Sequence, residues 1–212
     1  TMRGTQTTYD FTLDFMTGKV INPIAGFGKG KTQNGFTMAY NGLGPDPLEV
    51  RAADVPGKSL YSALNDTTKT KIKIGGHSLG SAISTLIANY AQSLNKFNRV
   101  EGYVSASPTV GNQVYADYFN ALRDKDGNTL GNNFYRLTNK NDLIPTLPGP
   151  LLGFIAVAQE VLFDTLYTNS EGKKDIPKNH SICCCYSYAL RHPQNPYNNA
   201  NEAGVENECV FP

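Results

Sequence analysis

A serine in a turn framed by glycines is the first residue of this sequence that could do chemistry. The segment Gly76–Gly80 reads G-H-S-L-G, with Ser78 at its centre. The alternating residues before it predict a strand, and apolar residues at helical spacing after it predict a helix. A serine at such a sharp turn exposes its hydroxyl above a sheet, beside a helix N-terminus that favours a developing oxyanion. The pattern predicts a nucleophile; the alternative is a plain glycine-rich turn.

A serine nucleophile needs a base, and the sequence contains three histidines. In strand–serine–helix sites of this kind the chain order is serine, acid, histidine. His77 comes before Ser78, which leaves His180 and His192. His180 follows the polar loop 172–179, and functional residues concentrate in such loops, whereas His192 ends a predicted helix. We therefore predict that His180 is the base.

The carboxylate that orients the base should follow a strand between Ser78 and His180. Asp142 meets this requirement, because it follows the predicted strand 133–138 through a short polar turn. Asp164 is a weaker rival, and Asp117 lies in the middle of a predicted helix. An aspartate that only caps a turn is the alternative interpretation of Asp142.

The elements that must position these residues alternate between strands and helices. Such alternation is typical of an α/β fold with a mainly parallel central sheet and helices on both faces. We predict one domain over residues 1–212, with a long surface loop at 41–57 and a polar C-terminal tail at 193–212. The predicted strands are 71–74, 100–105, 133–138 and 160–167, and the predicted helices are 59–68, 78–94, 115–122 and 181–190.

Length and composition set outer limits on the function. The chain has 212 residues, of which 40% are hydrophobic, and a formal net charge of +1. A charge so close to zero argues against nucleic acid as a partner, which would require a clustered basic surplus. No apolar run reaches the roughly 18 residues that a transmembrane segment needs. The composition therefore favours a globular domain with neither a nucleic-acid partner nor a transmembrane segment.

The four cysteines do not have the spacing of a metal site. Cys183, Cys184 and Cys185 are adjacent, and Cys209 lies near the C-terminus. Adjacent cysteines rarely bridge each other, because the geometry is strained. A bridge from the triplet to Cys209 is one possibility, and four unpaired, unreactive thiols are the other.

Four blocks of this sequence resemble those of the class 3 lipase family, which has the α/β-hydrolase fold, and a fifth block matches more loosely. The blocks occur in the order of the family and extend from residue 3 to about residue 190. Three positions depart from the family pattern: Ser81 and Ala106 stand where glycine is usual, and Thr109 where arginine is common. The blocks are Arg3-Gly4-Thr5, Gly76–Gly80, Ser107–Asn112, Asn139–Pro148 and, more loosely, His180-Ser181 with Tyr186.

The resemblance implies a role for each matching residue. Ser78 would be the nucleophile, Asp142 the acid and His180 the base, with an oxyanion hole formed by Thr5 and Leu79. The family's lid would fall at about residues 7–15, although an ordinary half-buried element fits that pattern equally well. The resemblance implies no metal or organic cofactor. The segment 148–163 would either line the acyl-binding side or belong to the core, and its candidate substrate-binding residues are Leu151, Leu152, Phe154 and Ile155.

The expected function is that of a serine carboxylic ester hydrolase acting on lipid esters, like a triacylglycerol lipase, and a lipid–water interface is one expected location of the substrate. A phospholipase A1 or a feruloyl-type esterase is an alternative within the same fold. A lipid-binding domain without catalysis is an alternative of another class. The preference among ester substrates separates the lipase from the phospholipase A1 or feruloyl-type esterase. Any ester turnover excludes the non-catalytic lipid-binding domain.

The N-terminus begins close to the first family block. In the family, the Arg3-Gly4-Thr5 block ends an early central strand, most of which would precede Thr1. We therefore expect this chain to be a fragment or a processed form whose N-terminal elements are missing. Any signal peptide would also precede Thr1, so the sequence leaves the location open and leans toward secretion.

Overall fold

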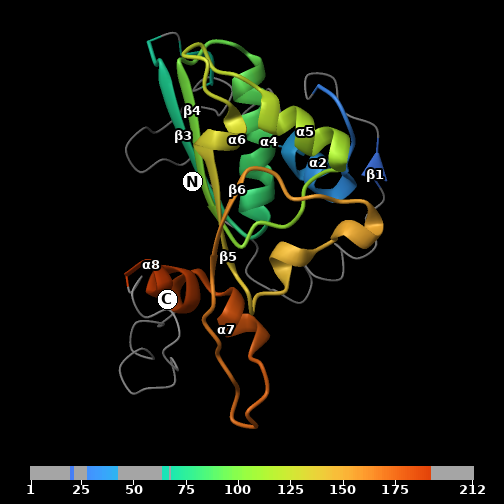
Figure 1. Ribbon diagram of the computed structural model, residues 1–212, viewed down its shortest axis with the longest axis vertical. Helices are drawn as coiled ribbons and strands as arrows, with labels where there is room; N and C mark the ends of the chain where they lie inside the picture. The colour runs from blue at the N-terminus through green and yellow to red at the C-terminus, as the bar shows by residue number, and fades with distance from the viewer. Residues whose placement is uncertain (1–19, 22–27, 43–63, 67, 192–212) are drawn as a thin grey trace.

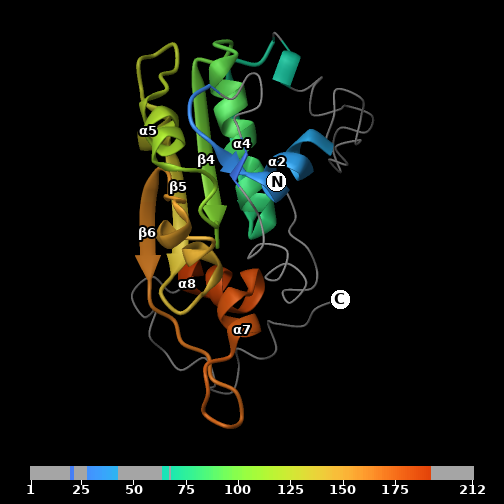
Figure 2. The ribbon, with the colours of Figure 1, turned by 90° about the vertical axis from the view of Figure 1, so that its right-hand side faces the viewer.

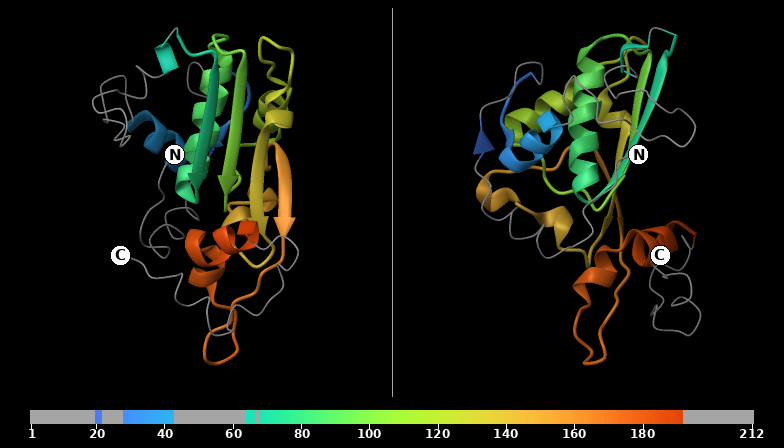
Figure 3. Two further views of the ribbon diagram at one scale, coloured as in Figure 1. Left: turned by 90° about the vertical axis from the view of Figure 1, so that its left-hand side faces the viewer. Right: turned by 180° about the vertical axis from the view of Figure 1, so that it is seen from behind.

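The computed structural model describes residues 20–21, 28–42, 64–66 and 68–191. A four-stranded sheet lies at the centre, with the strand order β3-β4-β5-β6 (Figure 1). All three strand pairs are parallel, so the four carboxyl ends meet at one edge, near helices α7 and α8 (Figure 3). The strands are β3 (Lys71–His77), β4 (Arg99–Ser105), β5 (Phe134–Asn139) and β6 (Gln159–Phe163).

Four helices lie on one side of this sheet, two of them directly against its strands, as the view turned by 90° shows (Figure 2). Helix α8 lies beyond the strand ends, toward the opposite side of the sheet (Figure 1). The four helices on this side are α2 (Asn34–Gly42), α4 (Leu79–Ser93), α5 (Gln113–Ala121) and α6 (Leu130–Asn133); α7 (Ile176–His180) and α8 (Ser187–Arg191) follow later in the chain.

Burial alternates along the central strand β4, as expected for a strand with one packed face. Val100 and Val104 are at most 3% exposed on the packed side, whereas Tyr103 is 52% exposed on the other side. Gly102 also faces inward, where a Cβ atom would come within 2.0 Å of the Phe134 ring. The fully buried Leu86 of α4 belongs to the same core cluster as these strand residues. The apolar residues that follow Ser78 at helical spacing thus form the face of α4 that packs against the sheet.

Short elements complete the described part of the chain. They are the antiparallel pair β1 (Val20–Ile21) and β2 (Thr32–Gln33), the 3-10 helices η1 (Ile144–Thr146) and η2 (Pro150–Leu152), and the π-helical turn η3 (Ile182–Tyr186).

The four predicted strands and the predicted helices at 78–94 and 115–122 are confirmed, with shifted ends. Strand β6 is shorter than predicted and ends at Phe163. The predicted helix 181–190 is divided into η3 and α8. The first two residues of the predicted loop 41–57 belong instead to the end of α2, and the rest of that loop lies outside the described residues. Most of the predicted helix 59–68 and the tail 193–212 also lie outside them.

Candidate active site

Ser78 occupies the turn between β3 and α4, as the sequence predicts. Its backbone has φ 57° and ψ −127°, a strained conformation that non-glycine residues rarely adopt. The Ser78 N–H donates to the carbonyl of Ser105 at 3.1 Å, which holds the turn against the end of β4. A Cβ atom on Gly76 would lie 2.3 Å from the carbonyl oxygen of Gly80, so the turn requires glycine at this position.

His180, the last residue of α7, bridges the serine and the predicted acid. Its Nε2 lies 2.7 Å from Ser78 Oγ, and its Nδ1 lies 2.8 Å from Asp142 Oδ2. An ionised carboxylate only accepts hydrogen bonds, so Nδ1 carries the proton and the neutral imidazole leaves Nε2 free to accept from the serine hydroxyl. All three residues are at most 6% exposed. The structure therefore brings the three predicted residues together in a single hydrogen-bonded chain.

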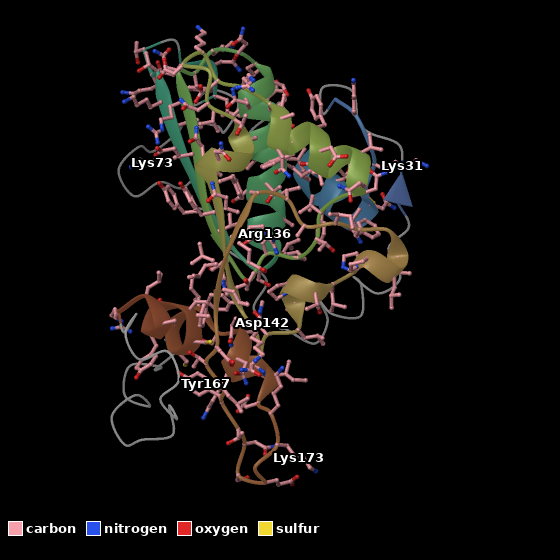
Figure 4. The ribbon with its side chains drawn as sticks, viewed as in Figure 1. Lys31, Lys73, Arg136, Asp142, Tyr167 and Lys173 are labelled. Atoms are coloured by element: carbon pink, nitrogen blue, oxygen red, sulfur yellow. The ribbon has the colours of Figure 1, made fainter. Side chains whose placement is uncertain are left out.

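Asp142 is fixed by the turn that follows β5. Its N–H donates to the carbonyl of Asn139 at 2.9 Å, and its Oδ1 accepts from the N–H of Ile144 at 3.0 Å. Asp142 lies near the carboxyl ends of the strands, whereas Lys73 lies in the amino-terminal half of β3 (Figure 4). Asp164, the weaker candidate for the acid, instead pairs with Lys140 at 3.1 Å. The candidate His192 lies outside the described residues.

Tyr186 is a partner of the acid that the sequence did not reveal. Its hydroxyl donates to Asp142 Oδ2 at 2.7 Å and accepts from the N–H of Asn139 at 3.2 Å. Asp142 thus accepts three hydrogen bonds, which fix the orientation of its carboxylate. The family block contains Tyr186, but no spacing rule places a residue 44 positions away against the carboxylate.

His77 lies beside His180 without joining the hydrogen-bonded chain. Its ring centroid is 4.9 Å from that of His180, and its Nδ1 is 2.9 Å from Ser105 Oγ. Burial, followed by repulsion from His180, lowers the pKa of His77 to about 4. His77 is therefore neutral near pH 7 and adds no positive charge beside the base.

Ser81, the first departure from the family pattern, has a structural partner. Its hydroxyl donates to the carbonyl of Ser105 at 2.6 Å, and Ser81 is fully buried. The same carbonyl accepts the N–H of Ser78. The first turn of α4 is thus bound to the end of β4 by two hydrogen bonds.

Of the two residues predicted to form the oxyanion hole, Leu79 lies among the described residues. Leu79 begins α4, so its N–H has no partner within the helix and can face an anion. Thr5 and the predicted lid 7–15 lie outside the described residues.

The predicted acyl-binding residues have different environments. Leu151 and Leu152 of η2 are exposed, whereas Phe154 is buried and Ile155 is partly buried. The alternative interpretation as core therefore fits Phe154, and the binding role of the other three remains a prediction.

The cysteine triplet contains three different environments. Cys184 is disulfide-bonded, whereas Cys183 is an exposed thiol and Cys185 a buried thiol. Burial, followed by the charge of Asp142, raises the pKa of Cys185 to about 12. Cys209, the predicted partner of the triplet, lies outside the described residues.

In the part of the chain that the structure describes, no three or more His, Cys, Asp or Glu side chains gather in a way that could hold a metal ion. Within the same residues, no helix has the length and apolar character needed to cross a membrane.

Comparison with known proteins finds lipases. The family model Lipase (class 3) matches residues 1–152. A secreted mono- and diacylglycerol lipase A of Penicillium cyclopium is 34% identical over 103 residues, covering 49% of this chain and 30% of that protein. Phospholipase A1-II 1 of Oryza sativa subsp. indica is 32% identical over 99 residues, covering 46% of this chain and 23% of that protein. The matched segment thus spans less than a third of these curated relatives.

Solved structures have the same fold. A mutant form of MDLA from Penicillium cyclopium superposes with a TM-score of 0.59 at 24% identity, covering 84% of this chain and 60% of that chain. The Lip2 lipase of Yarrowia lipolytica gives 0.58 at 22% identity, covering 82% and 59%. These likenesses show the α/β-hydrolase fold. Because the family model matches 152 of the 212 residues, the chain belongs to the class 3 lipase family.

Proposed function

We propose that this chain carries the active site of a serine carboxylic ester hydrolase that acts on lipid esters. The observation that carries the proposal is the chain of hydrogen bonds from Ser78 Oγ through His180 to Asp142, with distances of 2.7 and 2.8 Å. These distances allow direct proton transfer from the serine to the imidazole. Membership of the class 3 lipase family supports the same reaction.

The proposed reaction proceeds through an acyl-enzyme. Ser78 Oγ attacks the ester carbonyl carbon while His180 Nε2 takes the hydroxyl proton, and Asp142 stabilises the resulting imidazolium. The tetrahedral intermediate collapses as His180 returns the proton to the leaving alcohol. Water, activated by His180, then attacks the acyl carbon and releases the acid. Apart from the ester and water, the reaction requires only groups that the chain supplies.

The negative oxygen of the intermediate needs donors that are in place before the reaction. The N–H of Leu79, at the start of the 15-residue helix α4, is the described candidate. The family pattern adds Thr5 as the second donor. Removing one such donor generally costs about 10²- to 10³-fold in kcat.

For the substrate, we propose an acylglycerol presented at a lipid–water interface. The relative from Penicillium cyclopium is named as a mono- and diacylglycerol lipase, and the exposed leucines of η2 offer an apolar surface. The relatives from Penicillium cyclopium and Malassezia globosa are named as secreted, which favours secretion for the present chain.

A phospholipase A1 is the second candidate. The observation that favours it is the match to a rice protein of that name at 32% identity. Release of fatty acid from phosphatidylcholine, measured beside release from diacylglycerol, separates the two candidates.

Ester turnover tests the proposal. Purified wild-type chain and Ser78→Ala are compared on nitrophenyl esters of different chain lengths and on emulsified diacylglycerol. We expect Ser78→Ala to lose roughly 10³- to 10⁶-fold in kcat. Ser93→Ala is the matched control, because Ser93 lies at the other end of α4 and its hydroxyl donates to the carbonyl of Asn89 in the same helix. Equal turnover by wild type and Ser78→Ala would exclude the proposed nucleophile, and a wild type without turnover on any ester would favour a lipid-binding domain.

A further inference from the structure

An irregular segment after β6 contacts both turns that carry the acid and the base. Burial alternates along this segment: Thr165 is fully buried, Leu166 is 43% exposed and Tyr167 is 2% exposed. Such alternation indicates an extended backbone, whose residues i and i+2 present their N–H and C=O groups to the same side. Two asparagine side chains bind these groups.

Asn139 binds the backbone of Thr165. Its Oδ1 accepts from the Thr165 N–H at 3.1 Å, and its Nδ2 donates to the Thr165 carbonyl at 3.0 Å. Asn139 ends β5, and its own carbonyl accepts the N–H of Asp142 at 2.9 Å. The carboxamide therefore joins the acid-bearing turn to the segment.

Asn179 makes the same pair of bonds two residues farther along. Its Oδ1 accepts from the Tyr167 N–H at 3.0 Å, and its Nδ2 donates to the Tyr167 carbonyl at 2.8 Å. Asn179 directly precedes His180, so this carboxamide joins the base-bearing turn to the segment. Figure 4 shows Tyr167 close below Asp142.

The two asparagines are also linked to each other. Asn139 Nδ2 donates to the carbonyl of Asn179 at 3.2 Å, and both residues are at most 2% exposed. Together the two carboxamides satisfy four backbone groups that a neighbouring strand would otherwise satisfy. The turns that carry Asp142 and His180 are 38 residues apart in sequence. Both are therefore hydrogen-bonded to the backbone of the same short segment.

We propose that Asn139 and Asn179 are positioning residues that set the distance between Asp142 and His180 through the backbone of Thr165 and Tyr167. The inference rests on the proposed function, because it assigns the alignment of that same site. Neither asparagine touches the substrate. Loss of either carboxamide shifts one turn relative to the other, and a misplacement of about 1 Å can cost on the order of 10²-fold in rate.

The test compares Asn139→Ala, Asn179→Ala and the double variant with Asn169→Ala. Asn169 is a matched control, because its Oδ1 also accepts two backbone N–H groups, of Glu171 and Lys173, but in the exposed hairpin away from the triad. The proteins are produced in a host without N-glycosylation, since Asn179-His180-Ser181 has the sequence of an acceptor site. The readouts are kcat, KM and the far-downfield proton resonance of His180 Nδ1–H, which reports its bond to Asp142.

We expect each single variant to lose about 10- to 100-fold in kcat, with KM within about twofold of the wild type. The Nδ1 resonance should shift or disappear in both, while Asn169→Ala keeps the resonance and kcat of the wild type. The kcat of the double variant should be little lower than that of the worse single variant, because both asparagines align the same pair of residues, Asp142 and His180. Serine variants, which keep one bond, replace any alanine variant that does not fold.

Folded variants of both asparagines that retain the wild-type resonance and kcat would overturn the proposal. The resonance also separates the two inferences. A wild-type chain without ester turnover would refute the proposed function, and the resonance alone would then decide the positioning role. An active wild type with unaffected variants would refute only the positioning role.

Discussion

At the residue scale, the carboxylate of Asp142 is the best-anchored group of the site. Its Oδ2 accepts from both His180 and Tyr186, and its Oδ1 accepts from a backbone N–H. The Tyr186 hydroxyl is itself oriented, because it accepts the N–H of Asn139 and must therefore direct its proton at the carboxylate. Its ring packs edge-on against His77 and Phe163, with centroid distances of 5.4 and 5.1 Å. Tyr186 thus connects the acid to the ring cluster beside the base.

Tyr186→Phe tests this connection. The substitution keeps the ring but removes one donor from Asp142, so we expect kcat to fall about tenfold, the equivalent of one hydrogen bond of roughly 1.4 kcal/mol. Steady-state kinetics on a soluble ester provide the measurement. Tyr135→Phe, on the same strand side as Asn139 but at the amino end of β5, is the control and should remain within about twofold of the wild type. A Tyr186→Phe variant as active as that control would contradict the role.

The lowered pKa of His77 predicts that the stability of the fold depends on pH. Its pKa is lowered in the folded state from 6.5 to about 4, so between these values the unfolded chain binds more protons and stability falls as the pH falls. Because the ring is partly exposed, we expect a loss of roughly 2 kcal/mol between about pH 7 and about pH 4.5.

Urea unfolding of wild type and His77→Gln at both pH values measures this loss. His180, Asp142 and Tyr186 face His77 and are present in both proteins, so the difference between the two proteins isolates the contribution of His77. The variant should lose less stability on acidification. An equal loss in both proteins would show that His77 is not the group responsible.

The meeting of Ser78, His180 and Asp142 in one hydrogen-bonded chain was predictable from the sequence, because each residue has a local signal. Ser78 lies in a patterned turn, His180 follows a polar loop, and Asp142 follows a strand. The roles of Tyr186, Asn139 and Asn179 depend on contacts between distant segments, and a single sequence holds no signal for such contacts.

At the element scale, the strands and α4 were predictable from their periodicity, and shorter elements were not. Helix α2 contains Asn34 and Gly35, which have low helix propensity, and its N-terminus is stabilised by Gln33, whose Oε1 accepts the N–H of Phe36 at 2.8 Å. The segment 181–190 has a helical pattern, but it begins as the π-helical turn η3, which single-sequence patterns do not distinguish from an α-helix.

Ser81 shows how one hydroxyl attaches an element to its neighbour. Ser81→Ala removes the bond between α4 and the carbonyl of Ser105, which is 2.6 Å long. We expect the free energy of unfolding to fall by about 1 kcal/mol, because the carbonyl keeps its bond to the Ser78 N–H. Denaturant unfolding measures the change. Ser93→Ala, which removes a bond within α4 itself, should cost less, and a cost equal to that of Ser81→Ala would contradict the account.

At the scale of the whole molecule, the site forms where three remote segments meet at the carboxyl edge of a parallel sheet. This edge is where ligands bind in open α/β sheets. The fold class was predictable because strands and helices alternate in the sequence. Helices α2, α4, α5 and α6 lie on one side of the sheet, and Tyr103 and Tyr135 stack on the other face with a centroid distance of 5.5 Å.

The disulfide of Cys184 acts on the stability of the whole chain. A cross-link of this kind contributes about 2–4 kcal/mol, mainly by restricting the unfolded state. We expect Cys184→Ser to lower the free energy of unfolding by that amount, and Cys183→Ser, which removes an exposed free thiol, to change it by less than about 0.5 kcal/mol. Denaturant unfolding of both variants measures these free energies. Mapping of non-reduced peptides tests whether Cys209 is the predicted disulfide partner. Equal stabilities would contradict a structural role for the bond.

The central claim is that Ser78 is a nucleophile activated by His180 and Asp142. The most direct measurement is covalent labelling with a fluorophosphonate, followed by mass spectrometry of the peptide that contains Ser78. The account predicts one adduct per chain, on Ser78, no adduct in Ser78→Ala and a much slower reaction in His180→Ala, with Ser93→Ala labelled like the wild type. A wild-type chain that is folded but takes up no label at Ser78, or a Ser78→Ala variant labelled as fast as the wild type, would contradict it.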